Sequence, residues 1–348
     1  MKAMMLTGIR EMEMRDLPDP KISNPEDVLV RLSVVGVCGS DVHYYETGRI
    51  GSQVVEYPFT VGHESAGTVV EVGDGTQRLK PGDRIAIDPA KTCGNCDQCN
   101  CGRSNTCRHT AFLGCPGQAE GSLSEFIVMP ESSCYPIKDT TSFDEGSISE
   151  PLSIGIYSIK NSIPLTGARI GILGMGPIGM CVRFPARDAG VEKVYCTDKV
   201  RERLAMAAGM GVDYAGNPDT QDVVGEILDL EPSGLDVVFE CCGQQDAIDQ
   251  AIDLLKPGGK LMLIGIPQVD RIAFTIDKMR RKEICIQNVR RQEGCVRRAL
   301  DLMEEKRVDV NSLVTHRFPF SDTKSAFDLV AAYGDGVMKA MIDFECGT

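Results

Sequence analysis

Three side chains of the kinds that bind metal ions occur close together near the start of the chain. Cys38 opens the segment Cys-Gly-Ser-Asp-Val-His, and His63 and Glu64 end the segment Gly-His-Glu. A thiolate, an imidazole and a carboxylate form a mixed donor set that suits zinc with its fourth position open to water or substrate. An open position is typical of a catalytic zinc. The alternative is a buried cysteine and a hydrogen-bonded histidine that never meet, because free cysteine is among the most buried residue types.

Four further cysteines form the most specific pattern in the sequence. They are Cys93, Cys96, Cys99 and Cys107, in a loop rich in glycine and asparagine. Four thiolates at this spacing complete a tetrahedron around zinc and leave no open position, so they predict a structural zinc that braces the loop. An iron–sulfur cluster is the alternative, because cysteines separated by two residues also occur in ferredoxin-like sequences. Cys101 lies inside the cluster and is surplus.

A glycine-rich turn stands in the second half of the chain, with the sequence Gly174-Met-Gly176-Pro177-Ile178-Gly179. It follows a predicted strand and opens a predicted helix, the context in which such glycines let the backbone approach a pyrophosphate. Asp198 ends the next predicted strand, where it can accept a hydrogen bond from an adenosine ribose and repel a 2′-phosphate. NAD is therefore favoured over NADP, and Lys199 and Arg203 keep NADP as an alternative. A turn that serves packing alone is the other alternative.

The elements that must position these residues fall into two groups. Short β-branched runs, bounded by Gly, Pro and Asp turns, predict strands at 26–37, 66–72 and 84–87. From residue 151 strands alternate with helices, which is typical of a parallel sheet covered by helices on both faces. The predicted strands there are 169–174, 193–198, 235–241, 260–266 and 284–289, and the predicted helices are 177–189 and 247–255. Helices at 295–306 and 321–332 and a strand at 337–344 follow.

A chain of 348 residues exceeds the size at which a single core stops growing, so two domains are expected. We predict an α/β protein with a β-rich catalytic domain at 1–152, which contains the structural-zinc loop 93–107. An NAD-binding doubly wound domain follows at 153–289, and the segment 290–348 returns to the catalytic domain.

Composition limits the partners and the compartment. The net charge is −13 and no long basic run is present, which argues against nucleic acid and anionic membranes as partners. The longest charge-free apolar stretch, 170–182, is shorter than the roughly 20 residues of a membrane span. Arg10 and Glu11 interrupt the start before a signal-peptide core forms. The 15 cysteines are odd in number and fit metal binding in a reducing cytosol, so we expect a cytoplasmic protein with a small-molecule partner.

The order of these motifs along the chain carries a family resemblance. The segments Cys38 to His43, Gly62 to Glu64, the four-cysteine loop, Glu150-Pro-Leu-Ser and Gly174 to Gly179 together resemble the zinc-dependent medium-chain alcohol dehydrogenases over essentially the whole chain. Within that family the sequence is most similar to the sorbitol (polyol, L-iditol) dehydrogenase branch, through the segments 43–51, 150–155 and 314–319. The resemblance implies a GroES-like catalytic domain and a Rossmann domain, in a homotetramer or homodimer.

The resemblance also implies roles for individual residues. Cys38, His63 and Glu64 would hold the catalytic zinc, and Glu150 would hold its water, exchange as a ligand or contact substrate. Residues implied in the proton relay are Ser40 and His43, and those implied in binding substrate hydroxyls are Tyr44 and Arg291. Residues implied in cofactor binding are Gly174, Gly176, Pro177, Ile178, Gly179, Asp198, Arg203, Ile264 to Ile266, Val289 and Arg291. The polyol branch usually has Phe-Arg-Tyr where this chain has Arg290-Arg291-Gln292, so both neighbours of the implied substrate arginine differ.

The implied reaction is oxidation of a secondary alcohol of a polyol to a ketose, with zinc as the Lewis acid and hydride transfer to NAD. L-threonine, 2,3-butanediol and a cyclic polyol such as an inositol are alternative substrates. A nucleotide-binding protein without catalytic activity is the alternative outside the enzymes. Several of these residues have structural alternatives. Ser40 could cap a helix that begins at Asp41, and His43 and Tyr44 could be half-buried polar groups. Glu150 could pair with a nearby cation, and Arg290-Arg291 could form a solvated basic patch.

Overall fold

The computed structural model describes residues 1–345, and its contacts divide the chain into two units. Unit 1 comprises Met1–Glu150 and the chain from Val296 onward, and unit 2 comprises Pro151–Cys295. One helix, α3 (Phe143–Lys160), contains both Glu150 and Pro151. Within the described residues, no helix combines the length and the apolar character that crossing a membrane requires.

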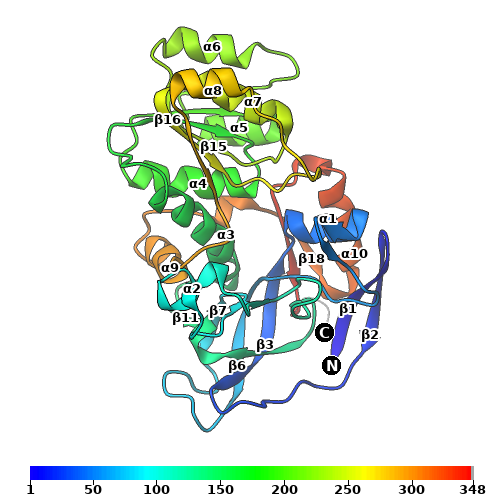
Figure 1. Cartoon of the computed structure of the whole chain (residues 1–348). Helices are drawn as coiled ribbons and strands as arrows, with labels where there is room; N and C mark the ends of the chain where they lie inside the picture. The colour runs from blue at the N-terminus through cyan, green and yellow to red at the C-terminus, as the bar shows by residue number, and fades with distance from the viewer. Residues whose placement is uncertain (346–348) are drawn as a thin grey trace. The chain divides into compact units, whose positions relative to one another are not determined.

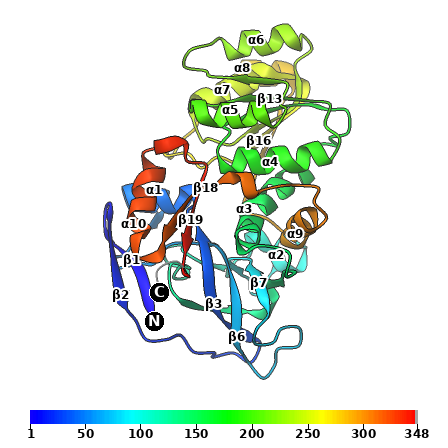
Figure 2. The ribbon, with the colours of Figure 1, turned by 180° about the vertical axis from the view of Figure 1, so that it is seen from behind.

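Unit 2 is built on a six-stranded parallel sheet with the order β14-β13-β12-β15-β16-β17. Its strands are β12 (Arg169–Leu173), β13 (Lys193–Thr197), β14 (Tyr214–Gly216), β15 (Leu235–Glu240), β16 (Leu255–Leu263) and β17 (Cys285–Asn288). Its other helices are α4 (Pro177–Asp188), α5 (Arg201–Gly209), α6 (Val223–Leu230), α7 (Gln245–Leu254) and α8 (Ile276–Lys282). Helices α6 and α8 pack against α7, and α4 lies on the opposite side of the strands (Figures 1 and 2). This strand order is that of the doubly wound dinucleotide-binding fold, so the predicted fold class is confirmed.

Buried apolar runs explain why the central strands of unit 2 were predictable. Ile170, Ile172, Val237 and Val238 are completely buried, as expected for parallel strands covered on both faces. The predicted strands of unit 2 agree with the structure to within a residue at each end except for β16, which spans Leu255–Leu263 rather than 260–266. After it, the chain turns and the Ile264 amide donates to the Glu240 carbonyl oxygen at 2.9 Å. Ile264 to Ile266 therefore lie in the connection that follows the strand.

Unit 1 is built on a seven-stranded sheet, with the order β11-β7-β6-β3-β19-β18 and with β10 pairing with β3. Its strands are β3 (Asp27–Gly36), β6 (Glu64–Val72), β7 (Arg84–Ile87), β10 (Phe126–Pro130), β11 (Cys134–Pro136), β18 (Val314–Pro319) and β19 (Lys339–Asp343). Three smaller pairs are β1 (Lys2–Gly8) with β2 (Glu11–Asp16), β4 (Arg49–Ile50) with β5 (Gln53–Val54), and β8 (Ala90–Lys91) with β9 (Ala111–Phe112). Strand β19 pairs antiparallel with β3, so the end of the chain completes a sheet begun near its start.

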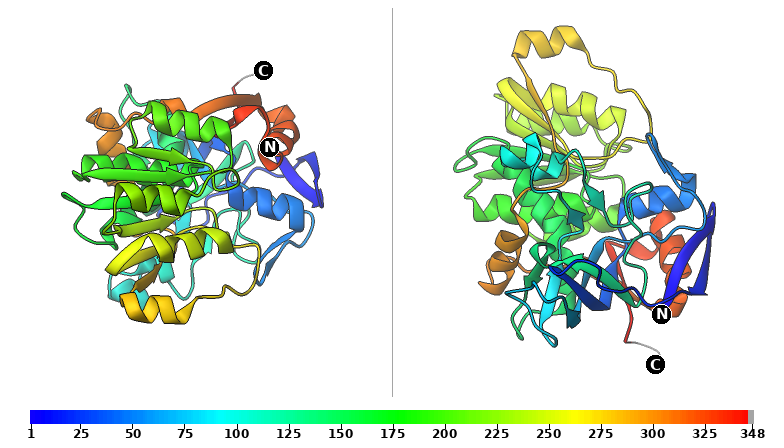
Figure 3. Two further views of the ribbon diagram at one scale, coloured as in Figure 1. Left: turned by 90° about the horizontal axis from the view of Figure 1, so that it is seen from above. Right: turned by 60° about the horizontal axis from the view of Figure 1, so that its bottom comes forward.

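The helices of unit 1, besides the part of α3 that belongs to it, are α1 (Gly39–Thr47), α2 (Asp97–Asn100), α9 (Val296–Glu304) and α10 (Thr323–Ala331). Single 3-10 turns occur at Ser104–Thr106, Glu131–Ser133, Asn311–Leu313, Phe320–Asp322 and Gly334–Gly336. Helices α1 and α10 lie side by side (Figures 1 and 3), with the Tyr45 and Phe327 rings in edge contact at a centroid distance of 5.4 Å. The Tyr45 hydroxyl donates to Asp328 Oδ1 at 2.7 Å, which fixes α1 against α10.

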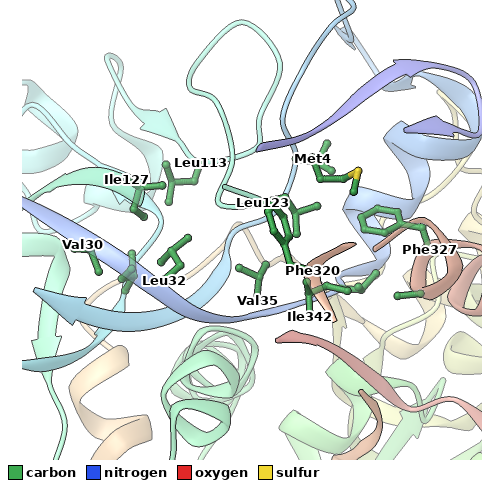
Figure 4. Packing of buried hydrophobic residues seen from close by; sticks show 14 of the residues in the cluster. Met4, Val30, Leu32, Val35, Leu113, Leu123, Ile127, Phe320, Phe327 and Ile342 are labelled. Carbon is green, nitrogen blue, oxygen red and sulfur yellow. The ribbon is translucent and has the colours of Figure 1, made fainter. Parts of the chain in front are cut away.

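The hydrophobic core of unit 1 draws on segments that are distant in sequence. Figure 4 shows Met4, Leu123, Phe320, Phe327 and Ile342 converging on one cluster. Because the same cluster includes buried residues of α1, it anchors the helix that follows Cys38.

Candidate functional site

The first predicted metal-binding group is brought together in unit 1. Cys38 is the N-cap of α1, His63 precedes β6 and Glu64 is the first residue of β6. One ligand atom from each of the three side chains lies within 4.8 Å of the others. This donor set and its compactness fit a zinc ion that keeps a position for a further ligand. The alternative in which the cysteine and the histidine never meet is wrong.

Asp41 connects the two ligand segments, a role that was not predicted from the sequence. Its Oδ1 atom lies 3.2 Å from His63 Nδ1 and accepts the Gly62 N–H at 3.1 Å, and its Oδ2 atom accepts the Cys38 N–H at 3.4 Å. Burial opposes a charged imidazole, but the charges of Asp41 and Cys38 raise the pKa of His63 well above its usual value. A carboxylate on Nδ1 leaves Nε2 for a metal. The position of Asp41, three residues after a ligand and in the first turn of a helix, was the available signal.

Lys339 holds Glu64 in a buried ion pair, which the sequence analysis also missed. Both side chains are only 1% exposed, and Lys339 Nζ lies 2.9 and 2.6 Å from the two carboxylate oxygens of Glu64. The same ammonium donates to the Val37 carbonyl oxygen at 3.2 Å. A Cβ atom at Gly36 would lie 2.4 Å from Glu64 Oε2, so the glycine makes room for the carboxylate. A lysine inside the apolar run 337–342, at the first position of β19, was the sequence signal for a buried partner.

Glu150 lies on α3 and is also buried. Burial raises the pKa of its carboxyl to about 7, and the nearby charge of Glu64 adds to the rise while that of His63 opposes it. Glu150 therefore keeps its proton to a higher pH than an exposed glutamate does in the metal-free protein. A divalent cation beside it would favour the carboxylate.

Ser40, His43 and Tyr44 lie on α1. The Ser40 hydroxyl donates to Cys38 Sγ at 3.4 Å, and the helix begins at Gly39, so the alternative in which Ser40 caps a helix from Asp41 is wrong. Burial lowers the pKa of His43, although Glu46 opposes the shift, so its imidazole is neutral at pH 7. Ser40 and Tyr44 are four residues apart and share one face of the helix.

The four-cysteine loop has the geometry of a mononuclear metal site. The Sγ–Sγ distances are 3.4 Å for Cys107 and Cys93, 3.6 Å for Cys96 and Cys99, and 3.9 Å for both Cys93–Cys99 and Cys96–Cys107. Zn–S bonds of about 2.3 Å imply a tetrahedral edge of about 3.8 Å, which these distances match. A multinuclear iron–sulfur cluster would separate the sulfurs further, so that alternative does not fit. Cys101 is exposed and its thiol donates to the Gln98 carbonyl oxygen.

The glycine-rich turn of unit 2 joins β12 to α4. Gly174 has a φ of +95°, and a Cβ atom at Gly179 would lie 2.0 Å from the Gly174 carbonyl oxygen, so the tight turn depends on both glycines. Gly176 is the N-cap of α4, and Pro177 is its first residue. A Cβ atom at Gly176 would meet only Arg203, whose Nη1 lies 3.2 Å from that position. The backbone there is open to a ligand such as a pyrophosphate.

Asp198 braces the same turn. One carboxylate oxygen accepts the Met175 N–H at 2.7 Å, and the other accepts the Val200 N–H at 2.7 Å. Each oxygen keeps a second lone pair for a ribose hydroxyl. The structure therefore holds a negative charge in a fixed position beside the turn.

The remaining predicted cofactor residues lie at the same edge of the parallel sheet. Ile178 is in the first turn of α4, after β12, Ile264 and Ile266 follow β16, and Val289 follows β17. Ligands of doubly wound folds bind at the carboxyl ends of the strands, which is this edge. Arg291 also follows β17 and has a φ of +53°. Beside it, Gln292 is buried and accepts the Cys295 N–H at 2.8 Å.

Comparisons with known proteins match both parts of the chain. Residues 24–139 match the model of the alcohol dehydrogenase GroES-like domain, and residues 177–305 match that of the zinc-binding dehydrogenase domain. The chain is 34% identical over 343 residues to sorbitol dehydrogenase of Bacillus subtilis, covering 98% of this chain and 97% of that protein. It is 33% identical over 345 residues to L-idonate 5-dehydrogenase of Vitis vinifera, covering 97% and 93%.

Among solved structures, the chain is similar to an oxidoreductase of unknown specificity from Escherichia coli. The TM-score is 0.93 at 30% sequence identity, and 98% of each chain is covered.

Proposed function

Because the chain belongs to the zinc-dependent medium-chain alcohol dehydrogenase family, we propose that it oxidises a secondary alcohol of a polyol to a ketose, with NAD as the hydride acceptor. The observation that carries this proposal is the convergence of Cys38, His63 and Glu64 within 4.8 Å. The similarity to a protein named sorbitol dehydrogenase favours a polyol as the substrate.

Zinc would be held by Cys38, His63 and Glu64, with Glu150 close enough to hold water or to exchange as a ligand. When bound, the ion supplies Lewis acidity that lowers the pKa of an alcohol. Asp41 orients the imidazole of His63, and Lys339 holds the Glu64 carboxylate. A second zinc, held by the four cysteines of the loop 93–107, would brace that loop and take no part in the reaction.

The proton of the substrate hydroxyl would leave through Ser40 and His43. Ser40 lies against Cys38 and can exchange its present sulfur partner for a substrate hydroxyl. The neutral imidazole of His43 can accept the proton and release it to solvent. These assignments follow from the family resemblance and from the positions of the two residues on α1.

NAD would bind along the carboxyl edge of the unit 2 sheet. The glycine turn offers the α4 N-terminus to the pyrophosphate, and Asp198 offers its free lone pairs to the ribose. The fixed charge of Asp198 favours NAD over NADP, because a 2′-phosphate would meet a buried carboxylate. When bound, NAD supplies the hydride acceptor.

The substrate proposal is tested by following NAD reduction on the zinc-loaded protein with sorbitol, xylitol, galactitol, myo-inositol, L-threonine, 2,3-butanediol and L-idonate. Strong turnover of an acyclic polyol supports the proposal. If the protein oxidises one of the other compounds and none of the acyclic polyols, the zinc and NAD assignments stand and the proposed substrate class is wrong. No turnover with any of them, in protein shown to contain zinc and to bind NAD, would contradict the proposed activity.

We also propose a cytoplasmic location and a homotetramer or homodimer. The cysteine content, with four cysteines grouped as metal ligands, fits a reducing compartment and supports the first, and the family resemblance supports the second. Fractionation of cells and sedimentation equilibrium of the purified protein test the two statements separately.

A further inference from the structure

Three polar side chains from separate segments of unit 1 meet beside the metal-binding group. The Tyr44 hydroxyl on α1 donates to Gln53 Oε1 on β5 at 3.3 Å. Gln53 Nε2 lies 2.6 Å from the sulfur of Cys115, which in turn lies 4.0 Å from the Tyr44 hydroxyl. Tyr44 and Cys115 are buried, whereas Gln53 is partly exposed. We call these three residues the Tyr44–Gln53–Cys115 cluster.

Two independent sets of contacts place this cluster next to the metal ligands. On α1, Ser40 contacts Cys38, and Tyr44 is four residues further on, about 6 Å along the axis. On the other side of the metal ligands, the residues just before Cys115 lie alongside the segment that carries His63. The Phe112 ring packs against the His63 ring at a centroid distance of 5.5 Å.

A backbone contact also places Cys115 close to His63. A Cβ atom at Gly114 would lie 2.9 Å from the Gly62 nitrogen, so the two glycine backbones are in direct contact. Gly114 has a φ of +66° and directly precedes Cys115, as Gly62 directly precedes His63. The cluster therefore flanks the metal-binding group from both the helix and the loop.

The chemistry of the cluster leaves capacity for a hydroxyl group. An amide has two N–H donors and an oxygen with two lone pairs, so the contacts with Tyr44 and Cys115 use half of the capacity of Gln53. A thiol sulfur is a weak acceptor, and an alcohol oxygen is a better partner for the amide N–H. The O–H group of an alcohol can also donate a hydrogen bond, which Gln53 Oε1 can accept.

We propose that Gln53, supported by Tyr44 and Cys115, binds a substrate hydroxyl that lies further along the carbon chain than the reacting one, and so selects polyols over simple secondary alcohols. The proposal rests on the proposed function and names a determinant of its substrate class. The amide N–H donates to the substrate oxygen, and the substrate O–H donates to the amide oxygen. A substrate without a second hydroxyl leaves these groups unmatched.

The test compares xylitol with 2-butanol as substrates of the zinc-loaded enzyme and of its Gln53→Leu variant. Loss of one neutral hydrogen-bonding partner should lower kcat/KM for xylitol roughly five- to tenfold, mainly through KM, and leave 2-butanol unchanged. Cys115→Ser keeps a polar partner and should keep the selectivity for xylitol. Gln77→Leu, at an exposed glutamine between β6 and β7, is the matched control and should behave as the wild type.

The outcomes separate the inference from the proposed function. If Gln53→Leu leaves the xylitol to 2-butanol ratio unchanged, or lowers kcat equally for both, the inference is overturned and the proposed function stands. An equal loss would mean that Gln53 only holds the β4–β5 hairpin. If the wild type oxidises 2-butanol but no polyol, the proposed substrate class and the inference both fail.

Discussion

A Lys339→Met variant should strongly destabilise unit 1 in the metal-free protein. Lys339 and Glu64 are each 1% exposed, and the ammonium contacts both carboxylate oxygens. Removing one partner of such a pair leaves a buried charge and typically costs about 3–5 kcal/mol. For a unit of this size, each kcal/mol lowers Tm by about 2–4 °C, so the expected decrease is roughly 6–20 °C. Zinc bound to Glu64 compensates the same charge, and the decrease should be smaller in the zinc-loaded protein.

The assay is urea and thermal unfolding of both proteins, with chelator and with excess zinc. Lys324→Met is the matched control, because its i,i+4 pair with Asp328 is about half exposed and is expected to contribute less than about 1 kcal/mol. The Glu64→Gln background removes the buried charge, so Lys339→Met should cost much less there. This reasoning would be refuted if the unfolding free energy of metal-free Lys339→Met lay within about 0.5 kcal/mol of the wild-type value, which is the size of effect expected of a surface substitution.

Four further predictions concern the metals, the cofactor and pH. Asp41→Asn should weaken zinc binding about 10- to 100-fold, measured by competition with a chromophoric chelator, because His63 loses its orienting carboxylate. Cys99→Ser should lower the zinc content from two ions per chain to one by elemental analysis, whereas the exposed Cys101→Ser should keep both. Asp198→Ala should shift the ratio of kcat/KM for NAD and NADP toward NADP, and an unchanged ratio would contradict its ribose role. Because the pKa of Glu150 rises from 4.5 to about 7 on folding, its contribution to the unfolding free energy of metal-free protein is present below pH 4.5 and is lost as pH rises through 7.

Two of these predictions have a control variant. Asp74→Asn, at an exposed turn residue, should leave zinc affinity unchanged, which separates the role of Asp41 from a general charge effect. Glu150→Gln should remove that part of the pH dependence in metal-free unfolding. An identical pH profile in Glu150→Gln would assign the dependence to other groups.

The sequence predicted most of the sheet in unit 2 because its strands are apolar on both faces. Ile170 to Leu173 and Leu235 to Glu240 need no knowledge of the rest of the chain to be recognised as buried strands. Short elements such as β14 and α6 were missed, since a few residues carry too little periodicity. The end of β16 was displaced because the apolar run continues through Ile264 and Ile266, beyond Leu263, the last residue of the strand, and the backbone bends at Gly265.

At the candidate site, the sequence predicted the donors and missed the residues that hold them. Cys38, His63 and Glu64 were recognisable from local spacing. Lys339 lies 275 residues from Glu64, and their pairing depends on β19 joining the sheet beside β3. The role proposed for Gln53 likewise could not be predicted from the sequence, because it depends on a contact with Cys115, 62 residues away. Contacts of this kind follow from topology and are not encoded in a local pattern.

The three hydrogen bonds of Asp41 have a consequence for metal exchange. They join the Cys38 and Gly62–His63 segments through protein atoms alone, so the relative positions of these two ligand segments do not depend on the ion. Metal uptake then requires little ordering of the chain, and substitution by cobalt is practicable in the folded protein. With zinc kept in the four-cysteine site, cobalt in the Cys38, His63 and Glu64 site alone would report thiolate coordination by Cys38 through its visible absorption.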